Sequence, residues 1–257
     1  MAKVRGGGVA GMSLLKGFNR VSGDIDASHR RVFCAVDGRE KQGKTHFALT
    51  APGPIAYFNF DFGSEGVIEQ FAKEKVVYSP VEYDFSVMGG GSNQVDCVRL
   101  WERFWAEWGE ALKKDNGIRT VVADTASEIW ELLRLARFGK LSQVMPMHYG
   151  PVNAEYKELL RKAANSDKNV ILLHRMKSEY VDEKRTGKYE RTGFGETGHI
   201  VQANLRCYRD SDNEWHVMVR DCRQNALLAG EELVGPMASF PFFASMVYPE
   251  SDIGEWE

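Results

Sequence analysis

Short apolar runs alternate with amphipathic segments along the chain. The runs are rich in β-branched and aromatic residues and are followed by polar groups, a pattern typical of buried strands. They cover residues 32–36, 55–60, 76–79, 120–124 and 169–174. Segments with apolar residues at helical spacing lie between them, at residues 65–73, 95–114, 126–138 and 153–164. This alternation predicts an α/β fold with right-handed crossovers.

Two further runs, at residues 200–209 and 215–223, alternate apolar and polar positions and are separated by a turn at 210–213. They predict a C-terminal β-hairpin. We expect one domain over residues 31–229, preceded by an N-terminal arm and lead-in segment at 1–30. Residues 230–257 are expected to form a tail that packs on the core and ends in a disordered acidic terminus.

Three tryptophans recur at helical spacing within residues 95–114. Trp101, Trp105 and Trp108 share one side of the predicted helix with Val98 and Leu112. A row of tryptophans can stack on nucleic-acid bases. This spacing instead favours a helix face that is buried against the sheet.

The strand at residues 32–36 runs directly into Gly38-x-x-x-x-Gly43-Lys44-Thr45. This pattern is typical of a phosphate-binding loop, whose backbone N–H groups converge on one spot at a helix N-terminus. Gly38 and Gly43 allow the backbone path, Lys44 offers charge to the outer phosphates, and the Thr45 hydroxyl can ligate Mg²⁺. A chance match in a glycine turn is the alternative, and the preceding strand argues against it. The expected nucleotide contacts are Gly38, Arg39, Glu40, Lys41, Gln42, Gly43, Lys44, Thr45 and His46.

Polar residues at the ends of three other strands complete the candidate site. Asp124 ends the buried run 120–124 and is expected to hold Mg²⁺ through a water or through the Thr45 hydroxyl. Asp61 follows the second strand and is well placed to face a ligand. His174 ends the strand 169–174, where it is either a γ-phosphate sensor or a strand-end histidine without a role.

The net charge of −3 and a pI of about 6.1 give no global sign of a nucleic-acid binder. Such a function must therefore rest on a local patch, and the polar segment 178–199 is the candidate. It interleaves basic residues with Tyr180, Tyr189 and Phe194, which suits backbone neutralisation and base stacking, and its glycines leave it free to order on binding. A solvated hairpin fits the same residues equally well. The candidate nucleic-acid contacts are Lys177, Lys184, Arg185, Lys188 and Arg191.

The cysteines and the apolar runs indicate the compartment. Cys34, Cys97, Cys207 and Cys222 show no Cys-x-x-Cys spacing, which favours reduced thiols over disulfides or zinc. The sequence has neither an apolar run of membrane-spanning length nor a signal-peptide pattern. We therefore expect a soluble cytoplasmic protein that has no membrane partner.

The order of these motifs resembles that of phage-encoded RecA-like P-loop ATPases, of the group that includes the Sak-type single-strand-annealing and recombination ATPases. The resemblance covers most of residues 30–225. Residues 38–45 resemble the phosphate loop, 57–61 the strand whose final acid activates water, and 121–125 the strand associated with Mg²⁺. Residues 173–177 resemble the strand that couples the γ-phosphate to a mobile DNA-binding loop, with His174 where RecA has a glutamine. Arg220 and Arg223 resemble the basic pair that reaches into a neighbour's active site.

This resemblance implies ATP hydrolysis with Mg²⁺ at a subunit interface, in the host cytoplasm if the protein is phage-encoded. Asp61, or less favourably Glu65, would orient water, and Arg220 or Arg223 would act in the adjacent subunit of a ring or filament. ATP would shift His174 and order residues 178–199 for single-stranded DNA, with a single-strand-binding protein as a candidate partner. The implied sheet is mainly parallel, with the His174 strand between the phosphate-loop strand and the Asp124 strand.

Two other functions use the same phosphate loop. A small-molecule phosphotransferase would need an acceptor pocket with an arginine lid, which the sequence does not identify. A nucleotide-gated interaction or DNA-packaging component would bind ATP with little hydrolysis. Asp61 distinguishes this switch from an ATPase and favours hydrolysis, because a switch has no need of an acid at that position.

Overall fold

The computed structural model describes residues 30–61, 66–80, 83–89, 93–141, 144–182 and 184–257. Residues from Arg31 to Glu257 form one compact unit. The expected arm thus lies outside the described residues except for Arg30, and Glu65 also lies outside them. Among the described residues, no helix combines the length and apolar character that a membrane crossing requires.

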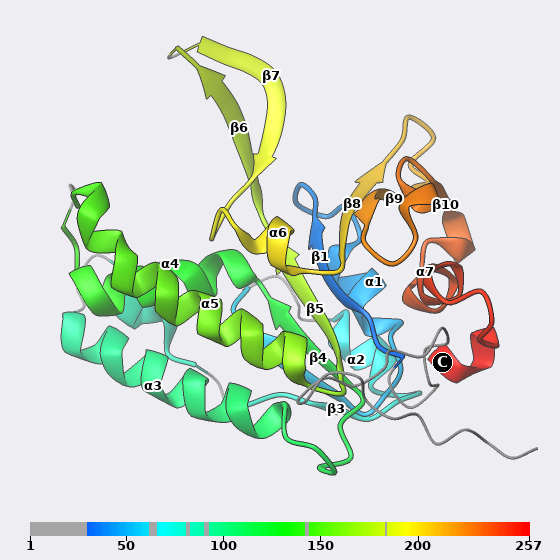
Figure 1. Ribbon diagram of the computed structural model, residues 1–257, viewed down its shortest axis with the longest axis horizontal. Coiled ribbons are helices and arrows are strands. Elements are labelled where there is room, and N and C mark those ends of the chain that lie inside the picture. The colour runs from blue at the N-terminus through cyan, green and yellow to red at the C-terminus, as the bar shows by residue number, and fades with distance from the viewer. Residues whose placement is uncertain (1–29, 62–65, 81–82, 90–92, 142–143, 183) are drawn as a thin grey trace, which may run out of the picture. The chain divides into compact units, whose positions relative to one another are not determined.

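A central eight-stranded sheet has the order β10-β9-β8-β1-β5-β4-β2-β3 (Figure 1). Strands β8 to β3 in this order run parallel, while β9 pairs antiparallel with both β8 and β10. The prediction of a mainly parallel α/β sheet with a C-terminal hairpin is confirmed, as is the position of β5 between β1 and β4. The strands are β1 Phe33–Asp37, β2 Ile55–Asn59, β3 Val77–Tyr78, β4 Thr120–Asp124, β5 Asn169–His174, β8 Ala203–Arg209, β9 Trp215–Cys222 and β10 Glu232–Val234.

Helices cover both faces of the sheet (Figure 1). One face carries α3, α4 and α5, and the other carries α1 and α7. The helices are α1 Lys44–Leu49, α2 Ile68–Phe71, α3 Gln94–Ala111, α4 Ala126–Phe138, α5 Tyr149–Asn165, α6 Thr197–Ile200 and α7 Phe240–Val247. The expected helix at 65–73 is thus only the short α2, and the expected strand at 76–79 is only β3.

Strand β1 shows how the apolar runs serve two cores. Side chains alternate across a strand, so Phe33 and Ala35 enter the core beneath α3 to α5. Cys34 and Val36 enter the core that contains Phe47 of α1. Because both faces are covered by helices, the strand must be apolar at every position, which accounts for its unbroken hydrophobic run.

The tryptophan face of α3 is buried, as its spacing predicts. Trp101 and Trp108 are almost fully buried with Phe104, and Trp105 packs at the margin of the same core. The rings of Phe58 in β2 and Trp108 lie 5.5 Å apart between centroids. These side chains hold the helix on the sheet, so Trp101 and Trp108 are not available for base stacking.

A second sheet, formed by β6 Met176–Val181 and β7 Lys184–Arg191, extends away from the central sheet (Figure 1). Its two strands pair antiparallel from Met176 and Arg191 at the base to Val181 and Lys184 near the tip. Residues that we expected to be free to order on binding therefore already lie in a paired hairpin. Beyond its base, Phe194 is buried and packs on Tyr156 of α5.

The C-terminal segment corrects another expectation. Phe240 and Phe243 of α7 are buried against the α1 side of the sheet. Asp252 caps a final helical turn, Ile253–Trp256, and the buried Trp256 ring stacks on Tyr248 at 5.7 Å between centroids. The acidic end is therefore ordered, because an aromatic anchor fixes it.

The four cysteines are free and buried.

Candidate nucleotide-binding site

The backbone of residues 38–43 connects β1 to α1 at the C-terminal edge of the sheet. A Cβ atom at Gly38 would lie 2.6 Å from the carbonyl oxygen of Cys207, so only glycine fits there. Gly43 precedes α1 with a φ of 84°, which also favours glycine. No side chain caps the N-terminus of α1. Its first N–H groups therefore remain available to an anion.

Lys44 and Thr45 occupy the positions that the motif predicts. Lys44 Nζ donates to the carbonyl oxygens of Gly38 at 2.9 Å and Arg39 at 2.8 Å, so its ammonium group lies against the loop. Burial lowers the pKa of Lys44, and the nearby Asp124 carboxylate opposes that shift. The Thr45 hydroxyl donates to Asp124 Oδ2 at 2.8 Å.

Asp124 is the acid of the site, and it is 1% exposed. Burial raises its pKa, while hydrogen bonds from Tyr57 and Thr45 act in the opposite direction. A hydroxyl and a carboxylate side by side are oxygen ligands of the kind that Mg²⁺ prefers. Thr45 and Asp124 therefore fit a Mg²⁺ site. Tyr57 was not predicted, because its contact with Asp124 depends on the pairing of β2 with β4, which the sequence does not show.

The other loop residues differ in exposure. Arg39, Glu40 and Lys41 are exposed. The Gln42 side chain accepts a hydrogen bond from the Arg209 backbone N–H. The half-buried His46 ring lies 4.2 Å from the Trp215 ring between centroids.

Asp61, the candidate water-orienting acid, takes part in an ion pair. Its Oδ1 atom accepts from Arg175 Nη2 at 3.2 Å. The other terminal nitrogen of Arg175 donates to Glu128 at the start of α4. Sequence reasoning missed Arg175, although it directly follows the end of β5. Its guanidinium lies between the two carboxylates.

His174 faces the base of the hairpin. It is fully buried, and its Nδ1 atom lies 3.0 Å from the carbonyl oxygen of Thr192. Burial, assisted by the charge of Arg191, lowers its pKa to about 3. The ring is therefore neutral near pH 7, and Nδ1–H donates to Thr192. The Nε2 atom has no hydrogen-bond partner among the described residues.

Asp37 is a centre that the sequence analysis did not identify. Its buried carboxylate lies 2.7 Å from Arg206, 3.2 Å from Arg191 and 3.4 Å from Arg220. Burial alone would raise its pKa, but the Arg206 hydrogen bond and the three guanidinium charges outweigh burial and lower it. An acid directly after the apolar run 32–36 was the available signal, since a buried carboxylate requires cationic partners.

This cluster changes the interpretation of two predicted residues. The Arg191 side chain is 15% exposed and binds Asp37, so it belongs to the base of the hairpin rather than to a nucleic-acid surface. The Arg220 side chain is 46% exposed and also reaches Asp37 of its own chain. Arg223 lies near the opposite edge of the sheet, where its guanidinium donates to the carbonyl oxygen of His199 at 2.6 Å.

The remaining basic candidates lie on the hairpin itself. Lys177 pairs with Glu190 at 3.2 Å. Arg185 donates to the Ser178 hydroxyl at 2.6 Å. Lys184 and Lys188 are exposed.

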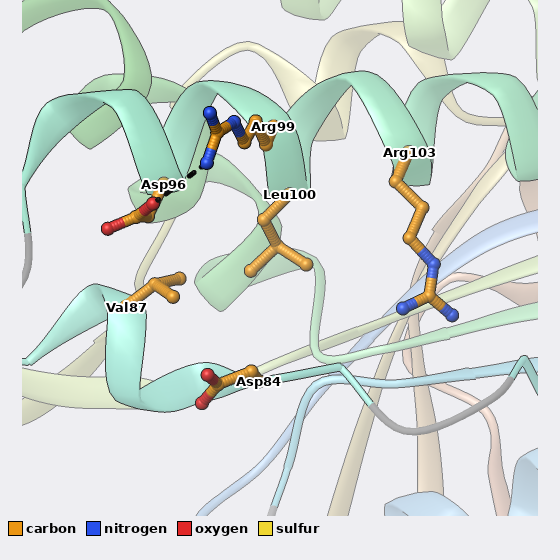
Figure 2. Close-up of a pocket in the computed structure, with 6 residues that line it drawn as sticks. All are labelled: Asp84, Val87, Asp96, Arg99, Leu100 and Arg103. Atoms are coloured by element: carbon orange, nitrogen blue, oxygen red, sulfur yellow. Dashed lines mark ion pairs between the residues drawn. The ribbon is translucent and has the colours of Figure 1, made fainter.

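A groove of about 250 Å³ lies elsewhere, along α3 (Figure 2). Its lining residues are Asp84, Val87, Asp96, Arg99, Leu100 and Arg103. It shares no residue with the phosphate loop. We therefore do not assign it to the nucleotide site.

A strand that runs into a glycine loop, with Thr45 bonded to an acid that ends another strand, defines a P-loop nucleotide-binding domain. Residues 30–202 match the AAA_24 family, described as an AAA domain, and the chain belongs to that family. Membership implies binding of a nucleotide, typically with Mg²⁺.

Among solved structures, the crystal structure of the RadB recombinase is similar, with a TM-score of 0.44 and 14% sequence identity. The similarity covers 79% of this chain and 86% of that chain. No curated protein matches the sequence.

Proposed function

We propose that this protein is a phage-encoded ATPase that acts on single-stranded DNA in recombination or replication, and that its β6–β7 hairpin is the DNA-binding element. The proposal rests on the P-loop site, the family membership and the resemblance to RecA-like recombination ATPases. The single observation that carries it is the connection of the hairpin base to the residues next to the phosphate loop. The phage origin and the host cytoplasm follow from the resemblance, and the cytoplasmic location also from the free cysteines.

For hydrolysis, the chain supplies groups that bind and orient. The loop N–H groups and Lys44 would bind the phosphates, and Thr45 and Asp124 would hold Mg²⁺, which would supply positive charge to offset that of the phosphate oxygens. Asp61 orients the attacking water once its carboxylate is released from Arg175. The Asp61–Arg175 ion pair also favours a second candidate function, a nucleotide-gated switch that hydrolyses slowly, because it occupies the acid in the present arrangement.

The hairpin is tied to the nucleotide site by contacts at both strands. At the end of β5, just before β6, the Nδ1–H of His174 donates to the carbonyl oxygen of Thr192, just beyond β7. At the end of β7, Arg191 binds Asp37, which directly precedes the phosphate loop. Higher on β7, the Tyr189 ring lies 4.9 Å from the guanidinium of Arg39, a loop residue. A shift of the loop on nucleotide binding is therefore transmitted to the hairpin.

One face of the hairpin suits single-stranded DNA better than the other. Arg185 bonds Ser178 and approaches the Tyr189 hydroxyl, and it pairs across the strands with Tyr180. These four side chains define the tyrosine face. Tyr180 is 62% exposed, so its ring is open to stacking on a base while Arg185 offers charge to the backbone.

The opposite face is less suited to an anion, because it carries carboxylates. Glu190 pairs with Lys177, and Glu179 accepts the Thr186 hydroxyl. A polyanion that approached this face would meet these acidic side chains beside the lysines. We therefore assign DNA binding to the tyrosine face. The exposed Lys184 and Lys188 alternate along β7 with Arg185 and Tyr189, so they add positive charge from the opposite face.

A homo-oligomer, either a ring or a filament, is part of the proposal. Arg220 is half-exposed and is held to Asp37 only by a 3.4 Å contact, so it remains available to a neighbouring subunit's nucleotide. Arg223, at the far edge of the sheet, is the other candidate. A single-strand-binding protein is a further candidate partner.

The test is the ATPase rate with and without single-stranded DNA, across a range of protein concentrations and at two salt concentrations. Stimulation by the strand, with a rate per subunit that rises with concentration, is the expected result. A rate that is indifferent to the strand would remove the DNA function. The absence of hydrolysis, with nucleotide binding retained, would leave the switch function instead.

A further inference from the structure

We propose that Arg175 is the residue that contacts the γ-phosphate of the bound nucleotide, in its own subunit, and that it exchanges Asp61 for that phosphate. The inference rests on the proposed nucleotide function. It replaces the γ-phosphate role expected for His174, and it adds an arginine within the same chain to the one expected from a neighbour.

The position of Arg175 follows from the strand register. Asp37 of β1 pairs with His174, and Asp124 of β4 pairs with Leu173, so β5 ends level with both. Arg175 is the first residue beyond this edge, between the strand that feeds the phosphate loop and the strand that carries Asp124. Ligands of open parallel sheets bind at this carboxyl edge.

The guanidinium of Arg175 lies on the nucleotide side of this edge. It reaches Asp61, which follows β2, and Glu128, which lies in the first turn of α4. Its charge also acts on Lys44: burial contributes most to the lowered pKa of that amine, and Arg175 adds to the same direction. The charges of the two cations therefore interact across the site.

The present partners of Arg175 are exchangeable. The Arg175, Asp61 and Glu128 side chains are 42%, 35% and 27% exposed, and ion pairs with this solvent access are weak. A phosphate offers a guanidinium stronger, charge-assisted and bidentate hydrogen bonds. Transfer of Arg175 to the phosphate would release Asp61, the acid that the proposed mechanism requires for water.

His174 is unsuited to this role. It is fully buried, and its one N–H is used by Thr192. With a pKa near 3 it carries no charge at neutral pH. Its neighbour Arg175 is charged and accessible.

Movement of Arg175 would also shift the base of the hairpin, because the two are hydrogen-bonded. Its carbonyl oxygen accepts from the Thr192 N–H at 2.9 Å and from the Thr192 hydroxyl at 3.0 Å. Its own N–H donates to Ser127 Oγ at 3.1 Å. The residue that senses the phosphate is therefore bonded directly to the base of the DNA-binding element.

The test compares the affinities of a non-hydrolysable ATP analogue and of ADP in wild type, Arg175→Ala and Arg175→Lys, measured by calorimetry. Arg175→Ala is expected to lower the affinity for the ATP analogue by about tenfold or more, because a hydrogen bond to a charged group is lost. The affinity for ADP should change by less than about twofold. Arg175→Lys, which keeps a charge without the planar fork, should retain part of the discrimination. Arg134→Ala is the matched control, because Arg134 pairs with Glu131 on the surface of α4 and should change neither affinity.

If Arg175→Ala lowers the affinities for the ATP analogue and for ADP equally, or lowers neither, the inference is wrong, although the proposed nucleotide site would still stand. If wild type binds neither nucleotide, the proposed function itself fails. If Arg175→Ala does not fold, as judged by its unfolding midpoint, Arg175→Lys decides: unchanged discrimination between the two nucleotides, relative to wild type, counts against a role for the fork.

Discussion

Replacement of Asp37 by asparagine should destabilise the protein more than any single substitution among the arginines around it. Asp37 is fully buried, and three guanidiniums share its carboxylate. Asp37→Asn removes the charge while keeping the shape and one acceptor oxygen. Arg191 and Arg206 would then remain partly buried without an anion.

The magnitude follows from the burial of the arginines. Loss of one partner of a buried ion pair costs about 3–5 kcal/mol. Arg191, at 15% exposure, approaches that case, whereas Arg206 at 26% and Arg220 at 46% are better solvated and contribute less. We therefore expect Asp37→Asn to lower the free energy of unfolding by about 3 kcal/mol, and Arg220→Ala to lower it by less than about 1 kcal/mol.

The assay is urea unfolding of each variant, with Asp212→Asn in the exposed β8–β9 turn as the matched control, expected within about 0.5 kcal/mol of wild type. A second measurement uses pH. The folded pKa of Asp37 is lowered, so its ionic contribution is complete above the unfolded value of about 3.9 and is lost as pH falls through the folded value. The difference in the free energy of unfolding between wild type and Asp37→Asn should thus be constant from pH 7 to about 5, and it should become smaller below about 3.9. A cost under about 1 kcal/mol at pH 7 would refute the claim that this cluster holds the site together.

Four further predictions address separate parts of the molecule. Lys44→Ala should abolish ATP turnover measured by phosphate release, and a wild-type rate would overturn the site. Tyr180→Ala should weaken single-stranded DNA binding by about tenfold in fluorescence anisotropy, the value of one stacked base, with Thr186→Ala on the other face as an unaffected control. Trp108→Ala should cost about 3–5 kcal/mol in urea unfolding, and a cost below 1 kcal/mol would contradict its place in the core. The folded state lowers the pKa of His174, so the free energy of unfolding should fall as pH drops below the unfolded value of about 6.5. At pH 5 the loss should be roughly 2 kcal/mol larger than in His174→Gln. Equal pH profiles of the two proteins would exclude a buried neutral ring.

The parts of the site that sequence reasoning found are local in the chain. The phosphate loop is contiguous, so residues 38–45 could be identified without knowledge of any tertiary contact. Asp124 could be predicted to share a Mg²⁺ site with Thr45, because Asp124 ends one buried apolar run and Thr45 belongs to the loop motif that follows another. The α/β class followed from alternation, whereas the order of β1, β5 and β4 needed the resemblance to a known family.

The contacts that sequence reasoning missed join distant residues. Arg191 and Asp37 are 154 positions apart, and nothing in the sequence distinguishes Arg191 from the exposed Arg185 on the same strand. The tilt and register of the hairpin decide which arginine is buried. In the same way, His174 and Arg175 are adjacent polar residues in the sequence. The end of β5 places His174 against Thr192 in the interior and Arg175 against Asp61 and Glu128. The terminal Trp256 was obscured by its acidic neighbours, although its burial anchors the end of the chain.

Burial divides the ion pairs around the phosphate loop into two kinds. A nucleotide brings several negative charges, which would compete with carboxylates for Arg191 and Arg175, because both arginines are already paired. At Asp37 the carboxylate is inaccessible, so Arg191 keeps its partner and the base of β7 stays attached to the end of β1. At Asp61 both members of the pair reach solvent, so Arg175 can exchange its partner. Arg191 then stays held at Asp37, while Arg175 and the Thr192 bonded to it can follow the ligand, and this difference would turn phosphate binding into a change at the base of the hairpin.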